Sequence, residues 1–440
     1  MRKMVAGIFA LVIVITIFAS CSTNISESPP TQARPNTEKT ILRLACYYPD
    51  GFIIKAVYDF NRTNNDFEIE IVDYSQYPDI VTRLNTEIIA GNAPDMFAWG
   101  FGVLNPLDSG VYGQAGTLMN LYEFIDNDND ISRSIFLGNL LSSLENSDGA
   151  LYEMPTEFVL RLFAGKTEVL GSKQGWTFED YFDLLERFPD STLPFGTLSW
   201  VEFFRLSVGN NYAIFLDWNK GECYFESEEF LRILEMGKTY YTAPIESILP
   251  IKLVMSDQQL LSSNGIGNVS SIQKFTALFG DEINYIGFPT SAGVGNCFII
   301  RNSLSISSSS RHQDICWQFL KGLISFEAQM ENVLVFPVNY EALSERVFNA
   351  PLYEEAGASL SYIDGDGDRW SVTFEDASPE ESEAVMQLIE SCDRVYRENR
   401  YILSIIEEEA PAYFSGIRTA EEAAHMIQSR VQIYMSEQSR

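Results

Sequence analysis

Apolar residues recur at every third or fourth position between residues 80 and 88, which predicts an amphipathic helix with one buried face. Gly91 ends this pattern, and Pro94 cannot continue a helix. Residues 96–99 then form a short apolar run of strand length that closes on Trp99. We therefore expect a helix that leads into a buried strand, with an aromatic side chain at the carboxyl end of that strand.

Predicted strands and helices alternate on both sides of this segment. In chain order they cover residues 41–46 (strand), 53–60 (helix), 67–71 (strand), 118–144 (helix), 296–306 (strand) and 312–323 (helix). Ser378 and Thr419 each begin a capping-box pattern, so the carboxyl end should be helical. This order is typical of α/β proteins in which a parallel sheet carries helices on both faces.

Several short motifs along the chain resemble those of one protein family. The first is the stretch Ala-Gly-Asn-Ala-Pro-Asp, which begins at Ala90 and precedes the strand that ends on Trp99. The others cover residues 148–155, 285–290, 317–321, 336–339 and 413–419. In this order they resemble the extracellular solute-binding proteins of ABC importers, in particular the large carbohydrate-binding family that includes maltose-binding protein.

The resemblance implies an α/β, two-lobe periplasmic-binding-protein-like fold of type II, in which each lobe is a mainly parallel sheet flanked by helices. The expected first lobe comprises residues 41–152 and 288–333. The expected second lobe comprises residues 153–287 and 334–440, including the carboxyl-terminal helices.

Sugar binding needs flat apolar faces and fixed polar groups that are presented from both sides of a cleft. Trp99 follows its motif as a stacking tryptophan follows the matching motif of the family, and Tyr48 ends the first strand at the same sheet edge. By its position, Glu157 matches a hydroxyl-binding glutamate of the family. In the second lobe the candidates are Trp200 and Trp370. Each candidate has a structural alternative, because the aromatic residues can pack in the core and Glu157 can serve in a hinge.

Two polar segments need a separate interpretation. Asp364 to Glu375 resembles a calcium-binding loop, with aspartates at alternate positions and a glutamate at the twelfth. Its sixth position is Arg369, where the sharp turn of such a loop needs glycine, so a solvated acidic loop is the alternative and no metal is assigned. Trp218 lies in a polar turn that has no reason to face a cleft, and we expect a structural role for it.

The amino terminus has the pattern of a lipoprotein signal. Basic residues at positions 2 and 3 precede an apolar run over residues 4–19, which closes on Phe-Ala-Ser-Cys21 as a lipobox does. A membrane-spanning helix is the alternative, but the run is shorter than the about 20 residues that a span needs. We expect a signal peptide over residues 1–20, lipidation of Cys21, and a flexible tether over residues 21–40.

Composition narrows the possible functions. The formal net charge of −31 disfavours nucleic acid as a partner, because such a surface repels phosphates. With only 2 histidines and no hydrolase, metalloprotease or phosphate-loop motif, the chain is expected not to be an enzyme and to need no cofactor. Hydrolysis by a pair of carboxylates stays open. Cys46 and Cys316 fit core positions, and one disulfide among the remaining cysteines is possible.

These features predict a monomeric receptor that is anchored by lipid to the extracellular face of the cell membrane. It would bind a small-molecule solute, a sugar and specifically an oligosaccharide, and present it to the permease subunits of an ABC transporter. A receptor for a peptide or another small solute is the nearer alternative. An extracellular carbohydrate-processing enzyme is the more distant one.

Overall fold

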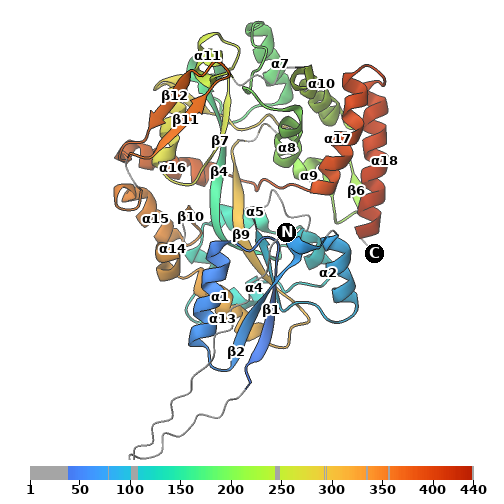
Figure 1. Cartoon of the computed structure of the whole chain (residues 1–440), viewed down its shortest axis with the longest axis vertical. Coiled ribbons are helices and arrows are strands. Elements are labelled where there is room, and N and C mark those ends of the chain that lie inside the picture. Colours follow the sequence, from blue (N-terminus) through green and yellow to red (C-terminus); the bar gives the residue numbers. More distant parts are fainter. Residues whose placement is uncertain are drawn as a thin grey trace, which may run out of the picture. The chain divides into compact units, whose positions relative to one another are not determined.

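The computed structural model contains a central sheet with the strand order β10-β4-β9-β3-β1-β2, in which β7 and β8 also pair with β4 (Figure 1). It describes residues 38–77, 79–100, 108–242, 248–291, 293, 295–332, 335–354 and 357–438. The predicted signal peptide, Cys21 and residues 22–37 lie outside the described residues. The strands of this sheet are β1 (Thr40–Cys46), β2 (Phe67–Asp73), β3 (Met96–Gly100), β4 (Met154–Lys166), β7 (Ser262–Ile266), β8 (Ile283–Tyr285), β9 (Cys297–Ile306) and β10 (Phe336–Pro337).

β1 lies between β2 and β3 and pairs with both in parallel. Leu42 and Leu44 on β1 are fully buried, as expected for a strand that is covered on both faces. α1 (Gly51–Thr63) and α2 (Ile80–Ile89) connect these strands, and Asp50 and Asp79 cap them with side-chain hydrogen bonds. The predicted alternation of strands and helices is confirmed for this part of the chain.

The prediction of a mainly parallel sheet in each lobe was wrong for the rest of the sheet. β9 runs antiparallel to both β3 and β4. The shorter strands β7, β8 and β10 also pair antiparallel with β4. β4 and β9 contain 13 and 10 residues, and they carry one continuous sheet from the lower to the upper half of Figure 1. A long apolar run fits a buried strand in either direction, so its composition does not reveal how it pairs.

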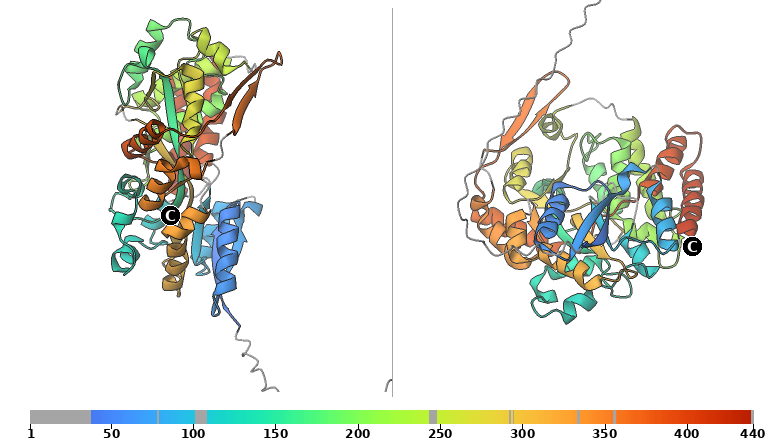
Figure 2. Two further views of the ribbon diagram at one scale, coloured as in Figure 1. Left: turned by 90° about the vertical axis from the view of Figure 1, so that its left-hand side faces the viewer. Right: turned by 60° about the horizontal axis from the view of Figure 1, so that its bottom comes forward.

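Helices cover the sheet in two groups (Figures 1 and 2). In the predicted first lobe these are α1, α2, α3 (Ser109–Gln114), α4 (Tyr122–Asn127), α5 (Gly138–Leu144), α13 (Gln313–Leu323) and α14 (Phe326–Asn332). In the predicted second lobe they are α6 (Thr167–Leu170), α7 (Phe178–Arg187), α8 (Trp200–Asn210), α9 (Tyr212–Phe215), α10 (Glu228–Thr242), α11 (Pro250–Met255), α12 (Gln273–Phe279), α15 (Tyr340–Phe348), α16 (Pro379–Ser391), α17 (Arg400–Phe414) and α18 (Ala420–Gln438). Two short hairpins, β5 (Leu216–Asp217) with β6 (Glu222–Cys223) and β11 (Ser359–Ile363) with β12 (Arg369–Thr373), complete the second lobe. Residues 39–440 form a single compact unit, and we keep the names first lobe and second lobe for the residue ranges predicted above.

The helix predicted over residues 118–144 is interrupted. α4 ends at Asn127, a single 3₁₀ turn follows at Arg133–Ile135, and α5 begins only at Gly138. Asp128 explains the break, because its carboxylate accepts hydrogen bonds from the backbone N–H of Asp130 at 2.8 Å and from Lys321 at 2.6 Å. A short acidic side chain that bonds to the backbone just after it competes with continuation of the helix.

The predicted helix starts and core thiols are confirmed. Ser378 and Thr419 form capping boxes in which the side chain and backbone of the cap both take part in hydrogen bonds. The five described cysteines are free and buried, namely Cys46, Cys223, Cys297, Cys316 and Cys392. In the part of the chain that the structure describes, no helix has both the length and the apolar character that a membrane span requires.

Candidate ligand-binding site

A cavity of about 330 Å³ lies between the two lobes, and we call it the interlobe cavity. Its first-lobe wall comes from α2, α3 and the residue that caps α3, and its second-lobe wall from Trp218, the cap of α17 and the end of α18. The lining residues are Val81, Asn85, Ile88, Ile89, Asp108, Val111, Tyr112, Ala115, Thr117, Trp218, Asn399, Tyr434, Glu437 and Gln438. Its volume is at the lower end of the range of about 300–1,000 Å³ that is usual for small-molecule sites.

Aromatic side chains from both lobes line this cavity. Tyr112 belongs to α3, whereas Trp218 and Tyr434 belong to the second lobe. The rings of Trp218 and Tyr434 meet edge to face with centroids 6.2 Å apart, and Tyr401 stacks on Tyr434 at 5.5 Å. These contacts hold the rings in place, so they offer preformed apolar faces to a ligand.

A chain of hydrogen bonds joins the two lobes beside the cavity. Trp218 Nε1 donates to the hydroxyl of Tyr212 at 3.1 Å, and that hydroxyl donates to Asp108 Oδ2 at 3.2 Å. The other carboxylate oxygen of Asp108 accepts from the backbone N–H of Gly110 at 2.9 Å and so caps α3. Asp108 therefore holds a fixed orientation while one of its oxygens faces the second lobe.

Two further polar pairs border the cavity. Tyr112 donates to Asn85 Oδ1 at 2.8 Å, and Asn399 donates to the hydroxyl of Tyr434 at 3.2 Å. Burial raises the pKa of Tyr112 above its ordinary value and raises the pKa of Tyr434 to about 12. Both phenols are therefore neutral at physiological pH. Tyr112 already donates its proton to Asn85, whereas the hydroxyl of Tyr434 accepts from Asn399 and keeps its own proton for a ligand.

Arg397 joins the second lobe to the start of β4. Its guanidinium lies 2.9 Å from Glu153 Oε1, and the other oxygen of Glu153 accepts from Ser303 Oγ at 2.7 Å. Burial opposes the charge on Arg397, but the carboxylates of Glu153 and Asp108 outweigh that effect and raise its pKa. This ion pair connects the segment before α17 to the start of β4, the strand that runs from one lobe into the other.

The structure places Trp99 behind the cavity wall. Its side chain is 7% exposed, its ring stacks on Phe97 at 5.6 Å and on Tyr112 at 6.1 Å, and its Nε1 donates to Ser305 Oγ at 2.6 Å. Trp99 is therefore in contact with a lining residue but does not itself line the interlobe cavity. A direct contact between Trp99 and a ligand stays a prediction.

Tyr48 and Glu157 also do not line the interlobe cavity. Tyr48 is exposed and has a positive φ of 54°, with its ring against that of Tyr47. Glu157 is buried and accepts a hydrogen bond from Asn302 at 2.8 Å, and burial raises its pKa. The same Asn302 amide donates to Asp50 at 2.8 Å, so Glu157 takes part in a contact between β4, β9 and the cap of α1.

Trp200 and Trp370 are not brought together with Trp99. Trp200 begins α8 and packs against Tyr241 and Phe414 in the second lobe, with centroids 5.9 Å away in both cases. Trp370 lies on β12 beside Tyr362, in the hairpin that stands out from the body in both views of Figure 2. Neither residue lines the interlobe cavity.

The expectation that Trp218 faces away from the cleft was wrong, because its indole lines the interlobe cavity. Asp108 and Tyr434 are further lining residues that sequence reasoning missed. For Trp218 a signal was present, since a large aromatic side chain in an otherwise polar turn is hard to explain by local structure alone. Tyr434 follows Val431 on the buried stripe of α18, so periodicity did not separate it from core residues.

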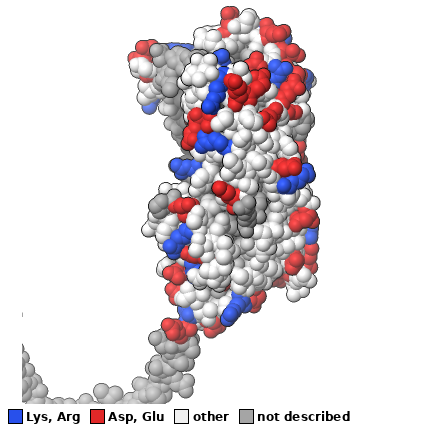
Figure 3. Space-filling view, turned by 90° about the vertical axis from the view of Figure 1, so that its right-hand side faces the viewer, with Lys and Arg blue, Asp and Glu red and all other residues white. Residues whose placement is uncertain are grey.

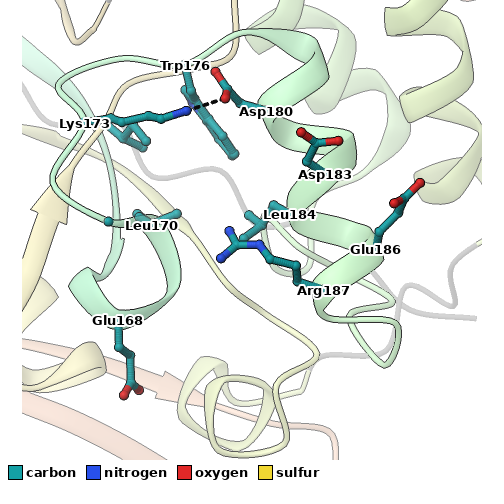
Figure 4. A pocket seen from close by; sticks show the side chains of 11 residues that line it. Glu168, Leu170, Lys173, Trp176, Asp180, Asp183, Leu184, Glu186 and Arg187 are labelled. Carbon is teal, nitrogen blue, oxygen red and sulfur yellow. Dashed lines mark hydrogen bonds and ion pairs between the residues drawn. The ribbon is translucent and has the colours of Figure 1, made fainter.

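A second cavity, of about 740 Å³, lies within the second lobe between α7 and the segment around Lys173 (Figure 4). Its floor is apolar and includes Trp176 and Leu184, while Lys173 at its rim is already paired with Asp180. Arg187 points into it and donates to the carbonyl of Val169 at 3.1 Å. Although this cavity is larger, its wall comes from one lobe only. The smaller cavity is the better candidate for a site that closes on a ligand, because both lobes contribute to it.

The acidic segment Asp364–Glu375 contains the turn of the β11–β12 hairpin. The ammonium group of Lys252 lies 2.6 Å from Asp364 and 2.6 Å from Asp368. Its hydrogen bond lowers the pKa of Asp364. A lysine thus neutralises two of the carboxylates that a calcium ion would need.

Calcium should therefore not stabilise the protein. After treatment with a chelator, addition of millimolar calcium should leave the melting temperature unchanged, because an ion that does not bind the native state cannot stabilise it. A Lys252→Met variant is the matched comparison, since it removes the ammonium group and keeps most of the side-chain volume. A calcium-dependent rise in the melting temperature of the unaltered protein would contradict the expectation.

Several solved structures with a similar fold are solute-binding proteins. An ABC substrate-binding protein from Listeria monocytogenes in complex with cycloalternan is 18% identical, covers 91% of this chain and 100% of its own, and has a TM-score of 0.52. A periplasmic oligogalacturonide-binding protein from Yersinia enterocolitica is 15% identical, with 91% and 100% coverage and a TM-score of 0.54. The sugar-binding protein MalE from Xanthomonas citri is 14% identical, with 90% and 98% coverage and a TM-score of 0.53. At these identities the likeness establishes the fold.

Sequence comparison identifies the family. No curated protein matches the chain. The family model of bacterial extracellular solute-binding proteins, however, matches residues 55–353, which is more than half of the chain and includes residues of both lobes. The chain belongs to the bacterial extracellular solute-binding protein family.

Proposed function

We propose that the protein captures an oligosaccharide in the interlobe cavity and delivers it to the permease subunits of an ABC importer. The observation that carries this proposal is the convergence of Tyr112, Trp218 and Tyr434 from two lobes on one cavity. Aromatic faces suit the C–H surfaces of pyranose rings, and the fixed polar groups of Asn85 and Asp108 suit their hydroxyls. The sugar and oligosaccharide ligands named for the structural neighbours support the same ligand class.

A ligand in this cavity would favour the closed arrangement of the lobes. Ligand binding shifts a conformational equilibrium only by the difference in its affinity for the two states. Contacts with Tyr112 on one side and Trp218 on the other exist together only when the lobes are close, so a bridging sugar supplies that difference. The hydrogen bond between Tyr212 and Asp108 would close the same gap from beside the ligand.

A panel of mono- and oligosaccharides, peptides and polyamines, screened by thermal shift and then by calorimetry, tests the ligand class. We expect oligosaccharides to raise the melting temperature and to bind with one site per monomer. The same glycans should remain intact after prolonged incubation, as read by chromatography. Binding of peptides alone would favour the other receptor class, and glycan turnover in proportion to protein would favour a carbohydrate-processing enzyme.

We further propose that a lipid on Cys21 holds the protein at the extracellular face of the cell membrane. A lipobox that lacks its cysteine cannot be lipidated, so Cys21→Ala should release the protein from membranes or leave it unprocessed. Cell fractionation with Cys46→Ala as control measures this, because Cys46 is a buried core thiol whose loss should not alter membrane association. If the Cys21→Ala protein is cleaved after its signal peptide and still sediments with membranes, the anchor proposal is wrong.

A further inference from the structure

The interlobe cavity has an uneven charge. Two carboxylates line it, those of Asp108 and Glu437, and its described lining includes no lysine, arginine or histidine. Asp108 belongs to the first lobe and Glu437 to the end of α18, so the two negative charges belong to opposite walls. A ligand in the cavity therefore meets negative charge from both sides.

The nearby guanidinium group of Arg397 does not cancel this charge. It forms its ion pair with Glu153, at 2.9 Å. The single positive charge of Arg397 is set against the two negative charges of Glu153 and Asp108, so one negative charge remains. Glu437 adds a second negative charge. Acidic side chains also gather on the upper part of the face that carries α17 and α18, where lysine and arginine side chains lie among them (Figure 3).

Asp108 keeps acceptor capacity for a ligand. An ionised carboxylate has about four acceptor sites. The described hydrogen bonds of Asp108 use two of them, one for the backbone N–H of Gly110 and one for the hydroxyl of Tyr212. A protonated amine has three donors and forms charge-assisted hydrogen bonds with carboxylates, which are stronger than neutral ones. The aromatic faces of Trp218 and Tyr434 add a favourable environment for a cation.

We propose that the interlobe cavity selects saccharides that carry a protonated amine, such as glucosamine units, and rejects uronic acids. This inference rests on the proposed function, since it names the class of sugar for the same site. An amine would be bound by Asp108 and Glu437 from the two walls, whereas a uronate carboxylate would be repelled by both. One structural neighbour binds oligogalacturonide, which is a polyanion. An oligogalacturonide therefore serves as the negative control, because the two carboxylates should repel it.

Calorimetry with four oligosaccharides of equal length tests the inference. The probes are a glucosamine oligomer, its N-acetylated form, a neutral β-linked glucose oligomer and an oligogalacturonide, all at pH 6 and low salt. We expect the glucosamine oligomer to bind at least about tenfold more tightly than its N-acetylated form, which corresponds to about 1.4 kcal/mol. The preference should shrink at high salt, and the oligogalacturonide should bind most weakly.

Variants that remove one carboxylate charge show which residues produce the preference for the amine. Asp108→Asn removes the charge and keeps the helix cap, because asparagine caps helices as well as aspartate does. It should reduce the preference for the amine about tenfold, and Glu437→Gln should reduce it as well. Asp183→Asn is the matched control, since it removes the same charge at the rim of the second-lobe cavity and should leave the preference unchanged.

The outcomes separate this inference from the proposed function. Equal affinities for the amine and its N-acetylated form, or tighter binding of the uronate, would overturn the charge selection and leave an oligosaccharide receptor standing. An amine preference that survives in Asp108→Asn and in Glu437→Gln would also overturn it, because the selection would then lie elsewhere. If none of the four oligomers binds, the proposed function and this inference both fall.

Discussion

Replacing Trp99 by alanine should lower the free energy of unfolding by about 3–5 kcal/mol, which is the usual cost of truncating a large buried aromatic side chain. The indole of Trp99 is 7% exposed and fills the space between Phe97 and Tyr112. Its N–H also donates to Ser305 at 2.6 Å, and the variant would leave that hydroxyl without this partner. Stability and ligand binding should both suffer, because the cavity left behind would loosen Tyr112.

Urea unfolding followed by circular dichroism measures this effect. Trp99→Phe is the matched comparison, since it keeps an aromatic ring in the stack but removes the N–H donor and part of the volume. It should cost less than Trp99→Ala. A Trp99→Ala protein that keeps nearly full stability and loses ligand binding would contradict this expectation, because it would mean that the indole stacks on the ligand rather than on the core.

The sequence predicted the first half of the sheet well because its patterns are local. The apolar spacing of α2, the break at Gly91 and the strand β3 that contains Trp99 follow one another directly in the chain, and all three signals favour the same helix–strand unit. The pairing of β4 and β9 was not predictable in this way. β4 and β9 are far apart in the chain. The sequence of an apolar strand does not reveal whether its neighbour runs parallel or antiparallel to it.

The candidate site could be predicted only in part for a similar reason. The motif around Trp99 lies beside the candidate site, because Trp99 contacts Tyr112 on the wall of the interlobe cavity. Trp218 and Tyr434, however, meet only because the β5–β6 turn packs against α18. No spacing in the sequence encodes that contact. Asp108 belongs to none of the motifs found in the sequence, and its role as a helix cap that also faces the second lobe follows from the fold.

Replacing Trp218 by alanine should weaken oligosaccharide binding by about 2–4 kcal/mol, or roughly 30- to 1,000-fold, on the scale of a binding hot spot. The variant removes an aromatic face from the second-lobe wall of the interlobe cavity. It also removes the N–H that donates to Tyr212 at 3.1 Å and so loosens the hydroxyl that donates to Asp108. Stability should fall less than in Trp99→Ala, because Trp218 is only half-buried.

Calorimetry on folded variants decides this prediction, and Trp200→Ala is its matched control. Trp200 is also a half-buried second-lobe tryptophan, but it packs on Tyr241 and Phe414 and does not line the interlobe cavity. Trp200→Ala should therefore lower stability and leave affinity nearly unchanged, whereas Trp218→Phe should recover most of the affinity that Trp218→Ala loses. If Trp200→Ala weakens binding and Trp218→Ala does not, the ligand binds outside the interlobe cavity, and Trp218 serves the structural role that its polar turn suggests.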